Sequence, residues 1–400
     1  MRHERTRATA RRDAPPTIFL ACPWTPVGGG MFKVADYLLQ SQADPVATPQ
    51  APPGSARLQP LDTRGDGSAA ASLLVLARAL ARLARACREG RVAGVHVNMA
   101  ERLSLVRKGV VVIACRLLDV PVVLHLHAAQ LHRAWPRFPR PLRWLVRRVF
   151  ALPAACIVLG RQSAEFVIDE LQVPRERVEV VINGVPQPQP AARRTQGPAR
   201  LLFVGNLSGR KGVPELLQAL ALPPLATLEV QLTLVGGGDL PYWRAMARGL
   251  GLGQRARFEG WADQPRVGQL LSQSDALVLP SHDEGLPLAI LEALAHGVPV
   301  VCTPVGEIPH LLSDGRDACF VPAGDAGALA QALARLLADA RLRESLARNG
   351  QALWREAFTL PRFFERIAAI HERHFGVCAT PAASGSTGHV PATLHEESIG

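Results

Sequence analysis

Glu284 and Glu292 are two carboxylates separated by seven residues, with Pro287 between them. Proline favours the first position of a helix, where its missing N–H would have no partner in any case. We therefore predict that Glu284 lies on a loop just before a helix and that Glu292 lies on that helix. The free N–H groups of residues 288–290 would then attract an anion. Carboxylates beside an anion site indicate a ligand with both phosphate and hydroxyl groups, whereas the simpler alternative is an ordinary helix with one solvated glutamate.

Glycine-rich turns follow two short apolar segments that we expect to be buried parallel strands. The first turn is Pro26–Gly30 and the second is Gly205–Gly212. A strand, a glycine-rich turn and a helix together can cradle a phosphate group, although the first turn lacks both the G-x-G-x-x-G and the Walker spacing. Lys33 falls in the first turn of the expected helix, where a cation is unfavourable unless an anion is close. Lys33 therefore favours an anion site over the alternative of a tight turn and nothing more.

His127 follows the apolar segment Val122–Leu126, at the carboxyl end of an expected strand. Ligands bind at this end of the strands in open α/β sheets. His125 lies on the same side of the strand but deeper, so we expect it to be buried and hydrogen-bonded. His127 is thus the candidate functional residue of the two.

Strands and helices alternate along both halves of the chain, which predicts two α/β domains with parallel sheets covered on both faces. Residues 43–67 are rich in proline and glycine and are expected to be irregular. The expected organisation is a basic flexible arm (1–15), a first domain (16–187), a linker (188–198), a second domain (199–356), a last helix (357–376) and a disordered tail (377–400).

Composition narrows the classes of partner. The net charge of +11 suits nucleic acid, an anionic membrane surface or phosphate-bearing ligands. Only Lys33, Lys108 and Lys211 are lysines among the 45 basic residues. The seven cysteines form no CxxC pair, which indicates reduced thiols and a reducing cytosol. No apolar run approaches the roughly 18 residues that a membrane span requires, so we expect the protein on the cytoplasmic side.

The order of these motifs resembles that of the retaining, GT-B-fold glycosyltransferases of family 4. The match is strongest over residues 200–322 and, with weaker parts, covers most of residues 17–375. It implies a GT-B fold, in which two Rossmann-like domains face each other across a cleft and the last helix crosses back to the first domain. The motifs that carry the resemblance are Gly205-x-Leu207-x-x-x-Lys211-Gly212, Phe258-Glu259-Gly260, Glu284-Gly285-x-Pro287, Glu292-Ala293 and Gly297-Val298-Pro299, with weaker ones at Gly28-Gly29-Gly30 and His125-Leu126-His127.

The resemblance implies that a nucleotide-diphosphate sugar binds mainly to the second domain. Lys211 would hold the diphosphate, Glu292 would accept from the ribose hydroxyls, and Glu284 would contact hydroxyls of the transferred sugar. No metal and no cofactor are implied, because cationic side chains and a helix start stabilise the leaving group. The expected catalytic residues are His127 and Glu284, and the expected donor-binding residues are Gly29, Gly205, Arg210, Lys211, Leu286, Leu288 and Glu292.

Two positions depart from the family pattern. Asn206 stands where an arginine is usual, and Arg210 is the obvious substitute. The usual Gly-Gly-x-x-Glu reads Gly306-Glu307-Ile308-Pro309-His310 in this chain. Because of the departure at Asn206, the identity of the second cation that binds the donor stays open. The departure at Gly306–His310 could alter acceptor binding or helix packing, and the sequence does not decide between the two.

A segment without acidic residues runs from Val120 to Ala164. Arginines interleaved with aromatic residues bind anionic lipid interfaces, whereas the alternative is a solvated basic helix whose aromatic residues belong to the core. Nucleic acid is not expected, since no recognition motif accompanies the charge. The candidate membrane and acceptor patch consists of Arg137, Arg140, Arg143, Trp144 and Arg147.

We therefore predict a retaining, metal-independent glycosyltransferase that moves a sugar from GDP-mannose or a UDP-sugar to a lipid-linked glycan. Surface-glycan or exopolysaccharide synthesis at the inner face of a bacterial inner membrane would suit this activity. The alternatives are a nucleotide-sugar epimerase on the same fold and a non-catalytic, basic protein that binds membranes or glycans.

Overall fold

The computed structural model describes residues 15–25, 29–42, 55–101, 103–128, 130–189 and 197–377. All but the last residue of the expected basic arm, Gly28, most of the expected linker and nearly all of the expected tail lie outside the described residues.

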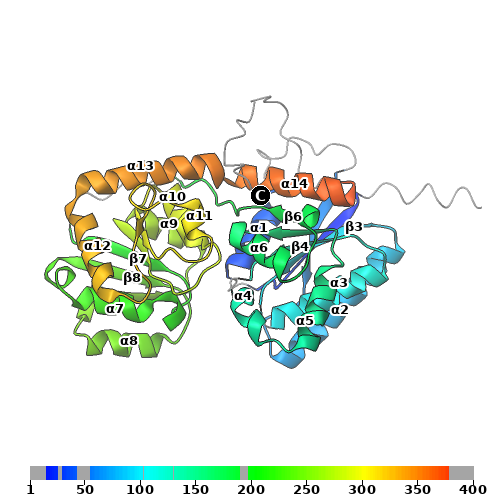
Figure 1. Ribbon diagram of the computed structural model, residues 1–400, viewed down its shortest axis with the longest axis horizontal. Coiled ribbons are helices and arrows are strands. Elements are labelled where there is room, and N and C mark those ends of the chain that lie inside the picture. The colour runs from blue at the N-terminus through cyan, green and yellow to red at the C-terminus, as the bar shows by residue number, and fades with distance from the viewer. Residues whose placement is uncertain are drawn as a thin grey trace, which may run out of the picture.

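Two six-stranded parallel sheets form the framework, one in each half of the chain (Figure 1). The strand orders are β2-β1-β3-β4-β5-β6 and β12-β11-β10-β7-β8-β9. In each sheet the strand order reverses beside the first strand of that half, and ligands bind at such switch points. The strands are β1 (Thr17–Cys22), β2 (Arg57–Asp62), β3 (Val92–Met99), β4 (Val122–Leu126), β5 (Ala155–Val158), β6 (Val178–Val180), β7 (Ala199–Val204), β8 (Val230–Val235), β9 (Ala256–Gly260), β10 (Ala276–Leu279), β11 (Val300–Cys302) and β12 (Cys319–Phe320).

Helices cover both faces of each sheet, which explains why β1, β4 and β10 are buried along their whole length. Aspartate side chains cap several helices; Asp263, for example, accepts from the N–H of Arg266. The helices are α1 (Gly30–Gln40), α2 (Ala69–Arg88), α3 (Leu103–Leu117), α4 (Leu131–Ala134), α5 (Arg140–Phe150), α6 (Arg161–Asp169), α7 (Val213–Ala221), α8 (Leu240–Gly249), α9 (Gln264–Ser272), α10 (Leu288–Ala295), α11 (Ile308–Leu311), α12 (Ala326–Ala338), α13 (Ala340–Ala357) and α14 (Leu360–Phe375).

Two local expectations were wrong, and one helix was missed. Part of the region expected to be irregular forms β2, which buries Leu58 and Leu61; Pro60 fits there because β2 is an edge strand. Helix α9 was not predicted at all. Pro287 precedes α10 as its N-cap instead of starting it, and its carbonyl accepts from the N–H of Ile290, which is therefore not free for a ligand.

The last helix joins the two halves. Figure 1 shows α13 along the second half and α14 continuing over the first. The chain crosses where Val185 and Thr359 form an isolated parallel bridge. Further along, Phe375 packs so closely on Gly94 of β3 that a Cβ at Gly94 would lie 2.4 Å from its ring. The return of this helix to the first domain is confirmed.

Candidate active site in the interdomain cleft

A cleft of about 550 Å³ lies between the two halves. Its volume falls within the usual range for small-molecule sites. The residues lining it come from the ends of strands in both sheets and from the start of α10. All nine residues expected to be catalytic or donor-binding line this one cleft: Gly29, His127, Gly205, Arg210, Lys211, Glu284, Leu286, Leu288 and Glu292.

Glu284 lies in the turn before α10 and is only 5% exposed. Its Oε1 atom accepts from Lys211 Nζ at 2.5 Å and from Ser281 Oγ at 2.7 Å. A carboxylate with so little access to water requires such partners, because an unpaired buried charge is strongly unfavourable. The lysine expected to hold phosphate thus also fixes the carboxylate expected to contact the sugar.

Glu292 lies on α10, every residue of which is buried. Its Oε1 atom is 3.2 Å from Nζ of Lys33, which belongs to α1 in the other half of the chain. This ion pair crosses the cleft and accounts for a cation in the first turn of α1. A ligand hydroxyl that binds Glu292 would therefore meet the ammonium of Lys33 beside it.

Lys211 reaches Glu284 because the backbone of the neighbouring Gly212 lies directly against that of Pro280. Gly212 has φ of +70°, and a Cβ there would lie 2.0 Å from the carbonyl oxygen of Pro280. Arg210 also lines the cleft, but its Nη1 donates to the carbonyl of Asp283 at 2.8 Å. Part of the Arg210 guanidinium is thus used to hold the turn that carries Glu284.

His127 is half-buried where β4 ends, and its Nε2 lies 3.0 Å from Asn98 Oδ1. An amide oxygen can only accept, so the Nε2 atom carries the proton and Nδ1 keeps its lone pair. Burial and, to a smaller extent, the nearby His96 lower the pKa of His127. His127 is therefore a neutral hydrogen-bonding group at neutral pH.

A row of histidines leads away from His127 into the first half. The rings of His125 and His127 are 4.0 Å apart, His125 Nδ1 lies 3.3 Å from His96 Nε2, and His96 Nδ1 lies 2.8 Å from Nε2 of His371 on α14. The expectation that His125 is buried and hydrogen-bonded is confirmed. Burial lowers the pKa of His96 to about 3.

Sequence reasoning assigned no role to two buried polar groups of the first half. Lys108 is fully buried, with Nζ 2.5 Å from Thr63 Oγ1, and burial lowers its pKa to about 8. Asn183 lines the donor cleft, and its Oδ1 has no partner. The segment Ile182-Asn183-Gly184-Val185 is one of the weaker motifs of the resemblance, but no site role was predicted for Asn183.

The five patch residues lie outside the cleft, on α5 and the turn before it. Arg143 donates to the carbonyls of Phe138 and Pro136, and Arg147 donates to that of Glu170. These two arginines therefore hold the local fold. Arg137, Arg140 and Trp144 are exposed.

Among the described residues, no group of three or more His, Cys, Asp or Glu side chains lies close enough to hold a metal ion. None of the helices in this part of the chain is both long and apolar enough to cross a bilayer. The six cysteines in these ranges are free.

Comparison with known families identifies both halves. A family model described as Glycosyl transferases group 1 matches residues 198–339, and one described as Glycosyltransferase Family 4 matches residues 29–187. The chain belongs to the group 1 glycosyl transferases of family 4. The two models together take in every residue that lines the cleft.

Named relatives cover parts of the chain. Alpha-D-kanosaminyltransferase from Streptomyces kanamyceticus is 26% identical over 64% of this chain and 71% of its own length. Glycogen synthase from Mycobacterium tuberculosis is 31% identical over 58% of each chain. Phosphatidyl-myo-inositol mannosyltransferase from Mycobacterium leprae is 34% identical over 42% of this chain and 46% of its own. The aligned stretches of the last two relatives thus span about half of their length.

Solved structures show the same architecture over nearly the whole chain. Sucrose-phosphate synthase from Thermosynechococcus elongatus has a TM-score of 0.72 at 20% identity, covering 90% of this chain and 98% of its own. HepE from Anabaena, in complex with UDP-glucose, has a TM-score of 0.69 at 19% identity, covering 89% and 99%. The expected GT-B fold is confirmed.

The buried histidines predict how stability depends on pH. In the unfolded chain the imidazoles regain a pKa near 6.5. Below about pH 6.5 the unfolded chain therefore binds more protons than the folded chain, and the free energy of unfolding falls as the pH drops toward about 3. Denaturant titrations at pH 7.5 and 5.0 measure this fall. His371→Gln, which cannot take up a proton, should make it shallower; an unchanged slope would contradict the assignment.

Gly212 and Gly209 offer a matched pair of substitutions. Gly212→Ala should lower the free energy of unfolding by more than about 1 kcal/mol, because its φ is positive and its Cβ would collide with backbone. Gly209 has no atom within 4 Å of an added Cβ, so Gly209→Ala should change stability little. Denaturant midpoints compare the two variants, and equal effects would refute this account of the loop.

Proposed function

We propose that this chain transfers a glycosyl group from a nucleotide-diphosphate sugar to a glycan acceptor. The observation that carries the proposal is the set of charges in the cleft. Glu284 and Glu292 are each only 5% exposed and lie close to the start of α10. Glu284 pairs with Lys211 of the same half, and Glu292 pairs with Lys33 of the other half. Carboxylates suit the hydroxyls of sugar and ribose, and the cations and helix start suit a diphosphate.

Each charged group takes a separate role in this proposal. Lys211 and Arg210 bind the diphosphate; an ammonium has three donors, so Lys211 can keep Glu284 and bind phosphate at the same time. Glu284 orients the transferred sugar, and Glu292 binds the ribose. The N–H groups near Leu286 and Leu288 stabilise the charge that develops on the leaving diphosphate.

The proposed reaction retains the anomeric configuration and uses no metal ion. Cationic side chains neutralise the leaving group in place of a metal, and the two glutamates do not work as an acid–base pair. His127 faces the transferred sugar and the acceptor from the opposite domain as a neutral hydrogen-bonding group. Closure of the two halves would exclude water from the donor and limit its hydrolysis.

The donor we propose is GDP-mannose or a UDP-sugar. HepE was solved with UDP-glucose, and one named relative is a mannosyltransferase. These likenesses support both donor classes.

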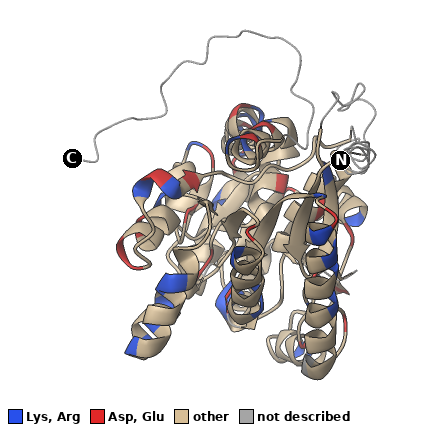
Figure 2. Ribbon diagram, turned by 90° about the vertical axis from the view of Figure 1, so that its right-hand side faces the viewer, with Lys and Arg blue, Asp and Glu red and all other residues tan. Residues whose placement is uncertain are grey.

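The acceptor we propose is a lipid-linked glycan, reached from an anionic membrane surface. Three neighbouring helices of the first half, α2, α3 and α5, contain no Asp or Glu and carry four, two and four arginines (Figure 1). The remaining basic residue of α3, Lys108, is buried and does not contribute to the face. Figure 2 looks onto this end of the molecule and shows blue basic segments on the helices nearest the viewer. A face of this charge would repel a second copy of itself and attract anionic lipid.

An apolar stripe adds to this charge. The outward residues of α3 are aliphatic apart from Arg116, and five of them are between 39% and 81% exposed. Exposed apolar surface bounded by basic residues is typical of proteins that lie on a bilayer. We propose that the protein is peripheral on the inner face of a bacterial inner membrane, where a surface glycan or exopolysaccharide is built. The stripe consists of Leu103, Val106, Val110, Ile113 and Leu117.

Sugar-nucleotide turnover, measured with and without a lipid extract, tests the proposed transfer. Transfer requires the extract, whereas an epimerase would convert the donor alone and a binding protein would do neither. Glu284→Gln should lower kcat by at least about 100-fold, and Lys211→Ala should raise the donor KM about tenfold or more, because each removes a buried charged partner. Glu344→Gln, at an exposed position of α13 in the same half, is the control. Full activity of Glu284→Gln would remove Glu284 from the site.

Vesicle sedimentation tests the membrane surface. The variant Val106→Gln/Leu117→Gln should bind vesicles of phosphatidylcholine with phosphatidylglycerol about tenfold more weakly, because two aliphatic side chains no longer enter the interface. Binding should also weaken with added salt, which screens the arginines. Tyr242→Ala, at an exposed aromatic residue of the second half, is the control. Equal binding to vesicles without anionic lipid would contradict the proposal.

A further inference from the structure

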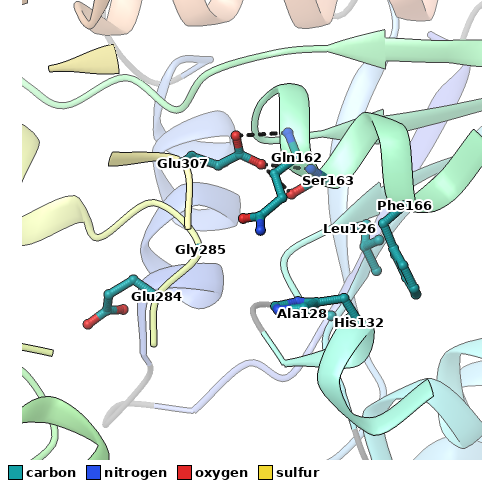
Figure 3. A pocket seen from close by; sticks show the side chains of 9 residues that line it. All are labelled: Leu126, Ala128, His132, Gln162, Ser163, Phe166, Glu284, Gly285 and Glu307. Carbon is teal, nitrogen blue, oxygen red and sulfur yellow. Dashed lines mark hydrogen bonds between the residues drawn. The ribbon is translucent and has the colours of Figure 1, made fainter. Parts of the chain in front are cut away.

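Glu307 is a buried carboxylate that reaches from the second half of the chain into the first. It is 1% exposed, and it lies at the start of α11. Its Oε1 atom accepts from the N–H of Ser163 at 2.8 Å and from Ser163 Oγ at 2.7 Å, and its Oε2 atom accepts from the N–H of Gln162 at 3.2 Å. These are donors of the first turn of α6, which have no partner within the helix. Figure 3 shows the carboxylate seated on that turn.

The backbone at Gly160 is shaped for this carboxylate. An added Cβ at Gly160 would lie 2.3 Å from Glu307 Oε2 and 2.4 Å from its Cδ. The φ of Gly160 is 175°, an extended conformation that any residue can adopt. Glycine is thus required at this position by the neighbouring side chain and not by its own backbone.

The same residue holds the turn that carries Glu284. The Glu307 N–H donates to the carbonyl of Gly285 at 3.1 Å. The preceding Gly306 has φ of +60°, and a Cβ there would lie 2.1 Å from the carbonyl oxygen of Glu284. Glu307 therefore bonds to α6 with its side chain and to the Glu284–Gly285 turn with its backbone.

The other ion pairs between the two halves are more exposed to a bound donor or to solvent than the Glu307 contact is. Lys33 and Glu292 both line the donor cleft, so a ligand competes for each. Arg133 and Asp283 are 3.6 Å apart, and Arg133 is half-exposed. Glu307 does not line the donor cleft. It lines a smaller crevice on the far side of Glu284, together with His132 and Phe166 (Figure 3).

We propose that Glu307 is a positioning residue that latches the two halves together and sets the Glu284–Gly285 turn as they close. The expected effect of Glu307 on kcat rests on the proposed transfer reaction. The contact between Glu307 and α6 does not depend on that proposal. Because Glu284, Glu292 and Lys211 all belong to the second half, loss of the latch leaves donor binding largely intact. It disturbs the placement of the turn against His127 of the first half, and so lowers kcat.

Hydrogen exchange of the Gln162 and Ser163 amides measures the latch directly. In the wild-type protein these amides should be protected, and in Glu307→Gly they should exchange roughly 10- to 100-fold faster, since a hydrogen bond to a charged group is lost. Gly160→Ala should have the same effect, because the new methyl group displaces the carboxylate. In the Glu307→Gly background, Gly160→Ala should change nothing further. Glu165→Ala, which removes an exposed carboxylate from the same helix, is the control.

Kinetics then test the positioning role. Glu307→Gly and Gly160→Ala should each lower kcat about tenfold, while the dissociation constant of UDP or GDP changes less than about threefold. Equal exchange of the two amides in wild type and Glu307→Gly would overturn the latch, whatever the activity. Altered exchange with unchanged kcat would overturn the positioning role. A wild-type protein without transferase activity, but with protected amides, would refute the proposed function and leave the latch standing.

Discussion

The ion pair between Glu284 and Lys211 is the interaction on which the candidate site depends. A carboxylate 5% exposed requires a charged partner, and the partner must arrive from a different strand end. Gly212 makes that approach possible, because no side chain separates its backbone from Pro280. The glycine-rich loop is thus explained by packing before any ligand is considered. The proposed phosphate binding uses Lys211, a lysine that the fold has already placed.

Polar contacts cross between the two halves beside the cleft, in addition to an apolar core that contains residues of both halves. Lys33 with Glu292, Arg133 with Asp283, and Glu307 with the first turn of α6 all cross between them. Contacts of this kind are directional and can be exchanged for ligand contacts, unlike a packed apolar interface. The chain itself, which crosses between the halves near Val185 and Thr359, and helix α14 connect the two halves permanently. This arrangement is consistent with the proposed closure of the two halves over a nucleotide-sugar donor.

The first half has an asymmetry of its own. Its inner side presents His127 to the cleft, and its outer helices present arginine and an apolar stripe without a single carboxylate. Not all of that charge is free, since Arg143 and Arg147 bond to backbone carbonyls. The remaining arginines give the first half a basic outer face, and the proposed contact with an anionic membrane surface is based on this face.

The sequence by itself determined most of the alternating strands and helices, the two-domain architecture and nine of the residues that line the cleft. The sequence pattern did not predict strand β2 and helix α9, because β2 is a six-residue edge strand containing proline and α9 has only nine residues. Local pattern also placed Pro287 one position too far into α10. Such errors arise because caps depend on backbone angles that spacing does not fix.

Only the tertiary structure decided which charges meet. Lys33 and Glu292 are 259 residues apart, Ser163 and Glu307 are 144 apart, and His96 meets His371 across 275 residues. No periodicity relates such positions, because their contact depends on sheet order, on the crossing of α14 and on the closure of two halves. The residues of the motif around Glu284 were therefore visible in the chain, whereas the partners that hold it in place were not.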